Sequence, residues 1–332
     1  MKILFVFTGG TIGSTLKKDN VIATDSKKAY KIIKEYAGKY PLDFDYDIVE
    51  PYTELSENNT GEHIRMLVGC VKEKLDAGYD GIIVTHGTDT LQYSAAALGY
   101  LLGGSSIPVC VVSSNKPIEH EMSNALPNLH AAIRFISERA GQGVFVPYRN
   151  EGDQRVYMHR GTRLIGAKAF SDDFISAFGE FYGYFDGRFE FVKNPTYAEL
   201  PDAMPTVSCE GISETSDGIR VVYPYPGMVY PALDGSVKYI LLNTYHSGTV
   251  NTLSESVRKY FLSAKEQGVK VYAVGVTGGP EYESVGAFGE LGIIPIRNIS
   301  PIAAYVKLWI LSLGGADPTE KLSLSLGGDI FA

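Results

Sequence analysis

The sequence has few cysteines, no excess of positive charge and no long hydrophobic run. Its 332 residues include three cysteines, Cys70, Cys110 and Cys209, which cannot all pair and form no close Cys-x-x-Cys spacing. This argues against a disulfide framework and a structural zinc site, and favours a reducing cytoplasm. Each cysteine is expected to be a small buried hydrophobic side chain.

The charge balance and the first residues of the chain bear on whether nucleic acid or a membrane is a partner. Lys and Arg number 30 against 38 Asp and Glu, for a net charge of −8, which argues against a general binder of phosphate backbones. No nucleic-acid partner is therefore expected. The first apolar run, Ile3–Phe7, is too short to span a membrane, and no basic head precedes a long apolar stretch. Neither a signal peptide nor a membrane segment is predicted.

Short apolar runs alternate with amphipathic stretches in the first half of the chain. Residues 3–7, 82–84, 109–112 and 144–146 are continuous hydrophobic runs typical of strands buried on both faces. The stretches around 64–75 and 129–136 repeat apolar residues at the helical period. This alternation predicts an α/β fold with a parallel sheet flanked by helices on both faces.

The pattern then changes and later resumes. Residues 156–170 are strand-like but interrupted by glycines, which suggests a β-hairpin or an extended arm. Six of the 16 prolines lie between residues 193 and 231, as expected of a linker. Strand-like runs at 239–242 and 271–274 and a helical face over 302–313 follow. We therefore predict a larger N-terminal α/β domain (1–190), a linker (191–232) and a smaller C-terminal α/β domain (233–332).

Ligands of parallel α/β sheets bind beyond the carboxyl ends of the strands, where two polar segments stand out. The first strand runs into Thr-Gly-Gly-Thr-Ile-Gly (8–13), and another runs into Thr-His-Gly-Thr-Asp-Thr (85–90). Both carry hydroxyls on glycine-bearing turns, where backbone N–H groups can converge on an anion. Two such turns in one domain are a more specific signal of a ligand site than either turn alone.

Several familiar chemistries do not fit these segments. There is no Gly-Lys-Ser/Thr of a phosphate loop, no Gly-x-Gly-x-x-Gly in the first turn, and no Gly-x-Ser-x-Gly nucleophile elbow. The six histidines form no evident triad with a serine. A threonine hydroxyl activated by a nearby lysine of tuned pKa would suffice for covalent attack on an amide.

The two segments together resemble the signatures of the bacterial-type asparaginase/glutaminase family, and the chain is most similar to its cytosolic type I branch. Ser56-Glu57-Asn58 resembles the family's substrate-binding loop. Arg160-Gly161-Thr162-Arg163 precedes Lys168 much as in that branch, with two residues more than the usual spacing. The match extends over essentially the whole chain and is weaker after the predicted linker.

The resemblance implies a role for each matching residue. Thr11 is the expected nucleophile, while Thr88, Asp89 and Lys168 would form the second catalytic group; which threonine attacks first stays open. Ser56 would hold the substrate α-carboxylate, and Glu57 and Asp89 its α-ammonium group. An acyl-enzyme would form and ammonia would leave, with neither cofactor nor metal. Ser114 follows another strand and is a candidate for the pocket wall.

Plainer interpretations accompany these roles. Lys168 alone would be an ordinary surface lysine, and Asp89 could cap the helix that begins near Thr90. Ser56 and Glu57 could be simple loop residues. His86 is predicted to be structural, hydrogen-bonded beneath its turn, rather than a base.

The sequence also departs from the family pattern in two places. The family's mobile-loop tyrosine is replaced by Val21, and Tyr30 is the nearest tyrosine that could substitute for it. Thr249 stands where many extracytoplasmic members carry an asparagine that reaches a neighbouring subunit. Both changes bear on rate and substrate preference rather than on the fold.

Three functions compete on these grounds: a cytoplasmic L-asparaginase, a glutaminase or ammonia-supplying amidotransferase subunit, and a non-catalytic amino-acid sensor. Transfer-RNA-dependent members have an extra N-terminal domain, whereas this chain starts almost at its first strand, which disfavours that alternative. We also expect a homodimer or homotetramer in which a neighbour's segments 245–249 and 277–283 close each site.

Overall fold

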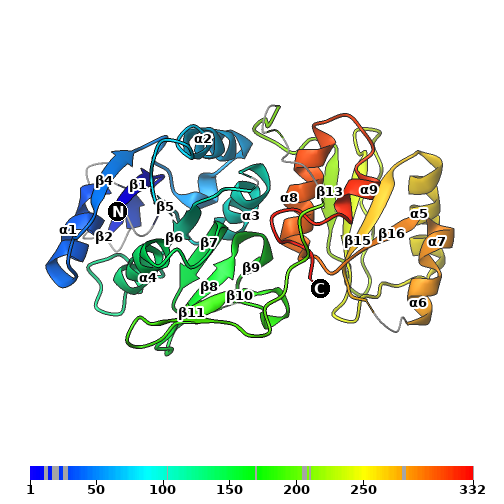
Figure 1. The fold of residues 1–332 in the computed structure, drawn as a ribbon. Helices are drawn as coiled ribbons and strands as arrows, with labels where there is room; N and C mark the ends of the chain where they lie inside the picture. Colours follow the sequence, from blue (N-terminus) through cyan, green and yellow to red (C-terminus); the bar gives the residue numbers. More distant parts are fainter. Residues whose placement is uncertain are drawn as a thin grey trace.

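The computed structural model describes residues 1–10, 14–16, 22–24, 29–102, 104–168, 170–203, 208, 211–278 and 282–331. It has two lobes, each built on its own sheet (Figure 1). The larger sheet has the order β12-β11-β8-β7-β6-β5-β1-β4, and the smaller one β13-β14-β15-β16. Two further two-stranded sheets, β2-β3 and β9-β10, lie outside them.

The larger lobe confirms the predicted α/β fold: strands β4, β1, β5, β6 and β7 run parallel, with β4 at one edge of the sheet. Its helices and strands are β1 (Lys2–Phe7), β2 (Ser14–Leu16), β3 (Ile22–Thr24), α1 (Ala29–Lys39), β4 (Asp45–Val49), α2 (Gly61–Lys72), β5 (Gly81–Thr85), α3 (Leu91–Leu101), β6 (Pro108–Val112), α4 (Ala125–Ser137), β7 (Gly143–Tyr148), β8 (Val156–Arg160), β9 (Leu164–Ala167), β10 (Phe174–Ser176), β11 (Gly183–Phe185) and β12 (Phe191–Lys193).

The alternation of side chains along β1 explains why helices cover both faces of this sheet. Leu4 and Val6 pack into the hydrophobic cluster that includes α2 and α3. Ile3, Phe5 and Phe7 point to the opposite face and pack with α1 and α4. All five side chains are almost completely buried. A strand covered on both sides carries hydrophobic residues at every position, which is why the run in the sequence is continuous.

The segment from 156 to 170 is divided between two sheets. β8 pairs antiparallel with β7 and extends the main sheet, and β11 and β12 add to it. β9 leaves the main sheet and pairs antiparallel with β10. The predicted hairpin or arm is therefore partly a sheet strand and partly a small hairpin, and this hairpin carries Lys168 at its end.

The smaller lobe is a parallel four-stranded sheet covered by helices. One face packs with α5 and α7, and the other packs on α8, which also belongs to the core of the larger lobe. The predicted linker (191–232) contains all of β12 and all of β13, and the domain limits stay a prediction. The elements of this lobe are β13 (Ile219–Val222), β14 (Tyr239–Asn243), α5 (Glu255–Glu266), β15 (Lys270–Val276), α6 (Glu283–Gly286), α7 (Phe288–Leu291), β16 (Ile293–Arg297), α8 (Pro301–Ser312) and α9 (Thr319–Leu322).

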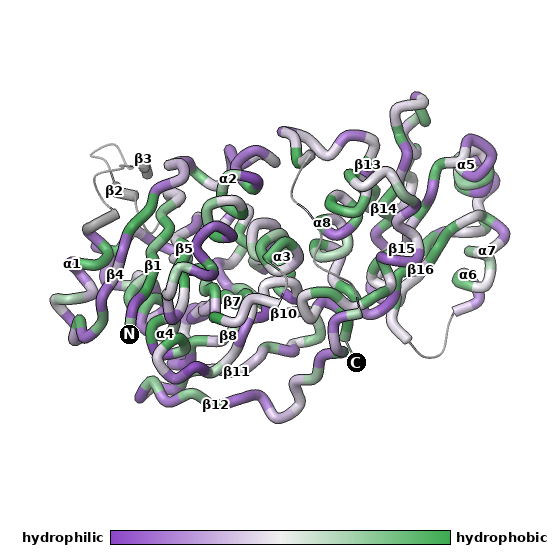
Figure 2. Tube along the Cα trace, turned by 45° about the horizontal axis from the view of Figure 1, so that its top comes forward, coloured by the Kyte–Doolittle hydropathy of each residue, from purple (hydrophilic) through white to green (hydrophobic). Residues whose placement is uncertain are grey.

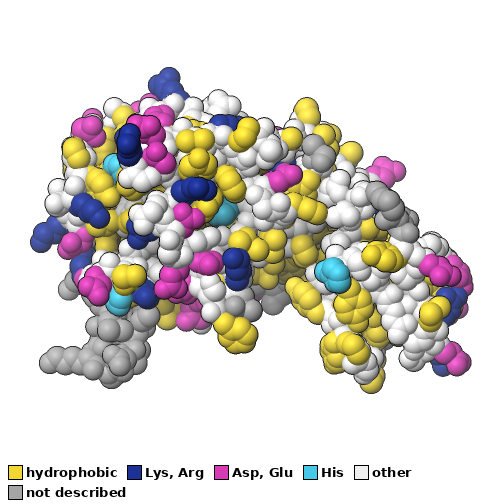
Figure 3. Space-filling model, turned by 90° about the horizontal axis from the view of Figure 1, so that it is seen from below, with side chains coloured by type: hydrophobic (Ala, Val, Ile, Leu, Met, Phe, Trp, Pro, Cys, Tyr) yellow, Lys and Arg dark blue, Asp and Glu magenta, His cyan; other side chains and the backbone are white. Residues whose placement is uncertain are grey.

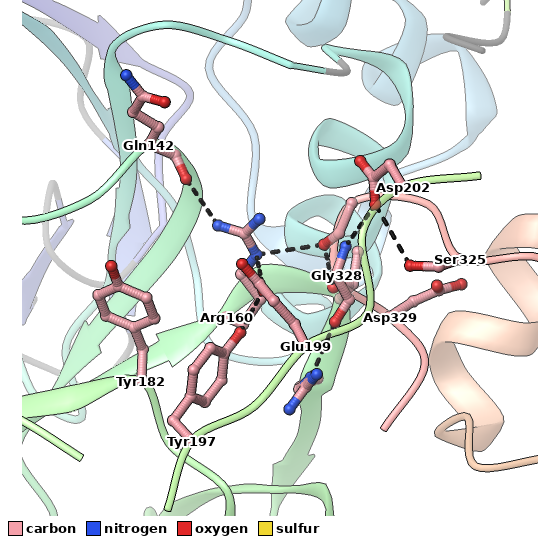
Figure 4. A network of polar contacts seen from close by, with 12 residues as sticks. Gln142, Arg160, Tyr182, Tyr197, Glu199, Asp202, Ser325, Gly328 and Asp329 are labelled. Atoms are coloured by element: carbon pink, nitrogen blue, oxygen red, sulfur yellow. Dashed lines mark hydrogen bonds and ion pairs between the residues drawn. The ribbon is translucent and has the colours of Figure 1, made fainter. Parts of the chain in front are cut away.

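The C-terminal segment returns to the larger lobe and is held there by two arginines. Fully buried Arg163 donates from Nε to the Gly328 carbonyl (2.8 Å) and from Nη2 to the Ile330 carbonyl (3.1 Å). Arg160 donates to the Gly327 carbonyl at 3.2 Å and lies 3.6 Å from Glu199 (Figure 4). The lobes are therefore joined by hydrogen bonds as well as by the shared core.

A buried ion pair reinforces this joint. Lys307 of α8 lies 2.7 Å from Asp329, which also accepts a hydrogen bond from the Tyr100 hydroxyl at 2.9 Å. Burial lowers the pKa of Lys307 and raises that of Asp329, and their mutual attraction opposes both shifts. Because each charge has a partner in the dry interior, the pair fixes the position of the C-terminal segment.

Within the part of the chain that the structure describes, no helix has the length and apolar character needed to cross a membrane.

Candidate active site

Three loops meet where β1 and β5 end. The Glu54 N–H donates to the Thr8 carbonyl at 3.0 Å, and the Gly10 N–H donates to the Glu54 carbonyl at 3.2 Å. The Thr8 hydroxyl donates to the Thr85 carbonyl at 2.6 Å. The first Thr-Gly-Gly segment, the 54–58 loop and the second threonine segment are therefore one hydrogen-bonded unit, as expected for the carboxyl edge of a parallel sheet.

Glycines allow these loops to approach so closely. Gly9 has a φ of +100°, and a Cβ atom there would lie 2.3 Å from the Glu54 carbonyl oxygen. A Cβ on Gly10 would lie 2.2 Å from the backbone nitrogen of Gly87. A Cβ on Gly87 would lie 2.4 Å from the hydroxyl oxygen of Ser56. Each distance is far below van der Waals contact. Gly9 and Gly10 would meet backbone atoms, which cannot move aside, whereas a Cβ on Gly87 would force the Ser56 side chain to shift.

Ser56 connects the second and third loops. It begins a short 3-10 helix (Ser56–Asn58), is almost completely buried, and accepts a hydrogen bond on Oγ from the Asp89 N–H at 3.2 Å. Its carbonyl accepts a hydrogen bond from the Thr90 hydroxyl at 2.8 Å. Glu57, next in the chain, is exposed. The structure thus brings Ser56 and Asp89 together and leaves the Glu57 carboxylate in solvent.

Thr88 and Asp89 occupy the turn just before α3. Thr88 is half-buried and Asp89 is exposed, so both side chains are accessible from solvent. Thr88 lies three residues before the first residue of the eleven-residue helix α3, whose free N–H groups favour negative charge near its first turn. A hydroxyl oxygen or a developing oxyanion at this turn would be stabilised by that arrangement.

His86 supports the turn from below and does not face solvent. It is fully buried, and Nδ1 lies 2.7 Å from the Gly87 carbonyl oxygen. A carbonyl oxygen only accepts, so Nδ1 carries the proton. Burial lowers the pKa of His86, the hydrogen bond to Gly87 opposing this, and the ring is neutral near pH 7. The predicted structural role is confirmed.

Lys168 lies at the mouth of the β9–β10 hairpin. Its side chain is 53% exposed, and Nζ lies 4.0 Å from Asp173 Oδ2. No hydrogen bond or ion pair joins it to Thr88 among the described residues. Gly166, two residues earlier, packs on Gln92 of α3, which donates to the Asp89 carbonyl at 3.3 Å. Gly166 therefore lies against the helix that follows the Asp89 turn, and the Lys168 side chain is largely exposed to solvent.

The other predicted site residues fall into two groups. Ser114 is fully buried and donates its hydroxyl to the Lys116 carbonyl at 2.9 Å, so its hydroxyl is committed to its own turn. Thr11 and Val21 lie outside the described residues, as does the side chain of Tyr30. For these three positions the sequence-based roles stay predictions.

Two residues that the sequence analysis did not single out also shape the site. Glu54 accepts hydrogen bonds from the Asn58 side chain and the Leu55 N–H, each at 3.0 Å, and these bonds lower its pKa. Asn59 lies near His86 Nε2 (3.3 Å) and Thr90 Oγ1 (3.4 Å). Glu54 precedes Ser56 and Asn59 follows it, each within three residues. Their contacts depend on how the loop folds, so the sequence alone carries no signal for them.

The described residues contain no group of three or more His, Cys, Asp and Glu side chains arranged to hold a metal ion. The described part of the site offers hydroxyls, a carboxylate and backbone N–H groups.

Comparison with known proteins identifies the family of the chain. The family description "Asparaginase, N-terminal" matches residues 2–196, which include the Ser56, Thr88 and Lys168 loops. The chain belongs to the asparaginase family. Its matched region spans the larger sheet and the β9–β10 hairpin, so the fold and the amide-hydrolysing character of the family apply to the part that carries the site.

The relatives divide into two kinds. The thermostable L-asparaginase from Thermococcus kodakarensis has a TM-score of 0.78 at 24% identity, and each chain is covered to 100%. L-asparaginase I from Vibrio cholerae has a TM-score of 0.78 at 21% identity, with 100% of this chain and 99% of that chain covered. These likenesses show the fold. Among curated proteins, a glutamyl-tRNA(Gln) amidotransferase subunit of Pyrococcus abyssi is 25% identical, over 93% of this chain and 72% of its own length.

Proposed function

We propose that this asparaginase-family amidohydrolase converts L-asparagine to L-aspartate and ammonia. The observation that supports the proposal is the hydrogen bond from the Asp89 backbone N–H to the Ser56 hydroxyl oxygen, which joins the two loops that carry the proposed carboxylate-binding Ser56 and the proposed ammonium-binding Asp89. An α-amino acid presents those two charges on one carbon. Thr88 is next to Asp89 in the chain and would face the side-chain amide of such a substrate.

The proposed reaction has two half-steps. A threonine hydroxyl, Thr11 or Thr88, attacks the amide carbon, and its proton passes to the departing nitrogen, which leaves as ammonia. Water then attacks the resulting ester and releases aspartate with the free hydroxyl. Lys168, with Asp89 nearby, would accept and return the proton, which requires its exposed side chain to turn toward Thr88. Backbone N–H groups at the Thr88 turn would stabilise the oxyanion.

The test is ammonia release by purified protein from L-asparagine, L-glutamine and D-asparagine, each at equal concentration. We expect L-asparagine to be preferred. Preference for L-glutamine would reassign the substrate while keeping the chemistry. Saturable amino-acid binding by calorimetry without ammonia release from any of the three would identify a sensor instead.

A second candidate is an ammonia-supplying component of a tRNA-dependent amidotransferase. It is favoured by the 25% identity, over most of the chain, to the glutamyl-tRNA(Gln) amidotransferase protein of Pyrococcus abyssi. The net charge of −8 opposes direct tRNA binding by this chain. A gel shift with glutamyl-tRNA(Gln) distinguishes the two: a specific complex, with ammonia release that depends on it, would favour the amidotransferase.

We further propose that the protein is a cytoplasmic homo-oligomer whose smaller lobe completes a neighbour's site. Tyr245 and Thr249 form a tight turn and, with Tyr282 and Glu283, line a hollow of about 660 Å³. Leu253 beside it is 90% exposed, and Figure 3 shows hydrophobic side chains gathered in the hollow between the lobes and on the smaller lobe. Exposed apolar clusters of this kind mark interfaces. Light scattering measures the mass of the particle in solution and so tests this assembly. A fully active monomer would exclude the proposal.

A further inference from the structure

Asn59 follows the short 3-10 helix that begins at Ser56, and it lies where two loops of the candidate active site meet. These loops lead into α2 and α3, which lie side by side on one face of the larger sheet (Figure 2). The Asn59 side chain is directed at the second loop: its Nδ2 lies 3.3 Å from Nε2 of His86 and 3.4 Å from Oγ1 of Thr90. One side chain therefore bridges the two loops.

The buried ring of His86 fixes which way this amide points. Nδ1 of His86 carries the proton and donates to the Gly87 carbonyl, so the neutral ring offers only a lone pair at Nε2. The group that faces this lone pair is therefore the Asn59 amide nitrogen, which donates to it. The Asn59 amide oxygen has no hydrogen-bond partner among the described residues, so the side chain acts on its surroundings as a donor.

Thr90 extends this contact to Ser56. A hydroxyl group has one proton, and that of Thr90 goes to the Ser56 carbonyl at 2.8 Å, so Thr90 Oγ1 accepts the second N–H of the Asn59 amide. The same Ser56 carbonyl accepts the backbone N–H of Asn59 at 3.1 Å. Asn59 thus holds Ser56 directly through its backbone, and by way of Thr90 through its side chain.

The Ser56 hydroxyl keeps its proton available for a ligand. Its oxygen accepts the N–H of Asp89 at 3.2 Å, and no described residue accepts its proton. A hydroxyl held in this way can donate to the α-carboxylate of an amino acid, which is the role proposed for Ser56. Where this donor lies depends on the contacts that hold the Ser56 backbone.

Capping of α2 does not account for the Asn59 side chain. The residue at the N-terminus of that helix is Thr60, whose backbone N–H donates to Nδ1 of His63 at 3.1 Å. The N–H of Gly61 donates to the Glu214 carbonyl at 3.0 Å. Other groups therefore secure the start of α2, and both side-chain contacts of Asn59 lead to the second loop.

We propose that Asn59 is a positioning residue of the substrate site, which holds the Ser56 hydroxyl where the α-carboxylate of an amino-acid amide binds. This inference rests on the proposed amidohydrolase function. In the part of the chain that the structure describes, no hydrogen bond joins Asn59 to Thr88 or Lys168, so Asn59 acts through Ser56 and not on the reacting atoms. Loss of an interaction that serves substrate and transition state equally should raise KM and leave kcat within about twofold.

Two single variants and their combination test the chain of contacts by calorimetric titration of aspartate and by ammonia release. Asn59→Leu removes both N–H donors, and Thr90→Val removes the hydroxyl; each should weaken aspartate binding and raise KM about threefold to tenfold, the effect of one neutral hydrogen bond. The double variant should bind about as weakly as the weaker single variant, whereas independent effects would multiply. Gln267→Leu, an exposed amide at the end of α5, is the matched control and should bind as the wild type does.

Asn59→Asp tests the direction of the amide. Aspartate is nearer to asparagine in shape than leucine is, but its carboxylate presents an oxygen to the lone pair of His86. Asn59→Asp should therefore bind aspartate more weakly than Asn59→Leu does. Wild-type affinity in Asn59→Asp, or losses that multiply in the double variant, would overturn the proposal.

Hydrogen exchange of the ligand-free protein separates this inference from the proposed function. The 86–90 segment should exchange faster in Asn59→Leu and Thr90→Val than in the wild type, because the Asp89 N–H is bonded to Ser56. Unchanged exchange in both variants would overturn the positioning role. If the wild type binds no amino acid, the proposed function fails, and the exchange rates still decide whether Asn59 positions Ser56.

Discussion

The backbone N–H of Asp89 donates a hydrogen bond of 3.2 Å to the hydroxyl oxygen of Ser56, 33 residues earlier in the chain. This bond joins the loop before α2 to the turn before α3. It exists because Gly87 has no side chain: a Cβ there would lie 2.4 Å from the same oxygen. Substrate-binding and catalytic candidates are thus held by one contact.

Replacing Gly87 tests this contact. Gly87→Ala should displace Ser56 and lower kcat/KM for L-asparagine by roughly 10-fold to 100-fold, the range expected for overpacking of 1 to 3 kcal/mol. Gly69→Ala on α2 is the matched control, because nothing lies within 4 Å of the added methyl group. It should keep full activity and raise the melting temperature. Wild-type kinetics for Gly87→Ala would contradict the proposed role of the contact.

The threonine hydroxyls are tested by isosteric substitution. Thr11→Val and Thr88→Val each replace a hydroxyl with a methyl group at nearly constant volume, so the fold should persist. We expect each to lower turnover by about 100-fold or more. Ammonia assays with circular dichroism decide the matter, and near-normal activity in either variant would remove that threonine from the mechanism.

The fold and the active-site loops could be predicted from local sequence, but the contacts between elements could not. Continuous apolar runs identify strands buried on both faces, and the polar residues after them lie at the sheet edge, as Thr88 does. The hydrogen bond from Asn59 to His86 joins loops 27 residues apart and leaves no local pattern. Equally, nothing in residues 156–170 distinguishes β8, a main-sheet strand, from β9, a hairpin strand.

Lys168 is the site residue whose role depends most on movement. Lys168→Met should lower turnover about 100-fold or more while changing aspartate affinity by no more than about threefold, since a proton carrier does not hold the amino acid. Lys72→Met, exposed at the end of α2, is the control and should change neither. Calorimetric titration of aspartate beside the rate separates the two effects. Wild-type turnover in Lys168→Met would show that Lys168, assigned across a two-residue insertion, is not the catalytic lysine.

The C-terminal segment should contribute strongly to stability through Arg163. Its guanidinium is fully buried, bonds to the carbonyls of Gly328 and Ile330, and lies 4.7 Å from the Phe331 ring centroid. Arg163→Met removes these bonds and leaves buried carbonyls unpaired, which should cost about 3 to 5 kcal/mol of unfolding free energy. Arg65→Met, exposed on α2, should cost less than about 0.5 kcal/mol. Urea denaturation measures the unfolding free energy of both variants. Equal losses in Arg163→Met and Arg65→Met would contradict the stabilising role of Arg163.

Buried histidines should make the protein less stable in mild acid. Burial lowers the pKa of His159 to about 3, so it stays neutral in the folded protein while the unfolded chain binds a proton below about 6.5. The unfolded state therefore holds more protons between these values, and stability falls with falling pH in that window. His159 alone should cost about 2 kcal/mol between pH 7 and pH 5.

The variant His159→Gln isolates this contribution, because glutamine does not titrate. Urea denaturation gives the unfolding free energy at pH 7 and at pH 5. Between these pH values, His159→Gln should lose about 2 kcal/mol less unfolding free energy than the wild type does, whatever the variant's stability at pH 7. His120→Gln is the control: His120 is exposed, and its replacement should leave the wild-type loss of unfolding free energy unchanged. Burial of His86 lowers its pKa as well, so part of the acid sensitivity should persist in His159→Gln. An identical pH dependence in His159→Gln and wild type would mean that His159 becomes protonated in the folded protein.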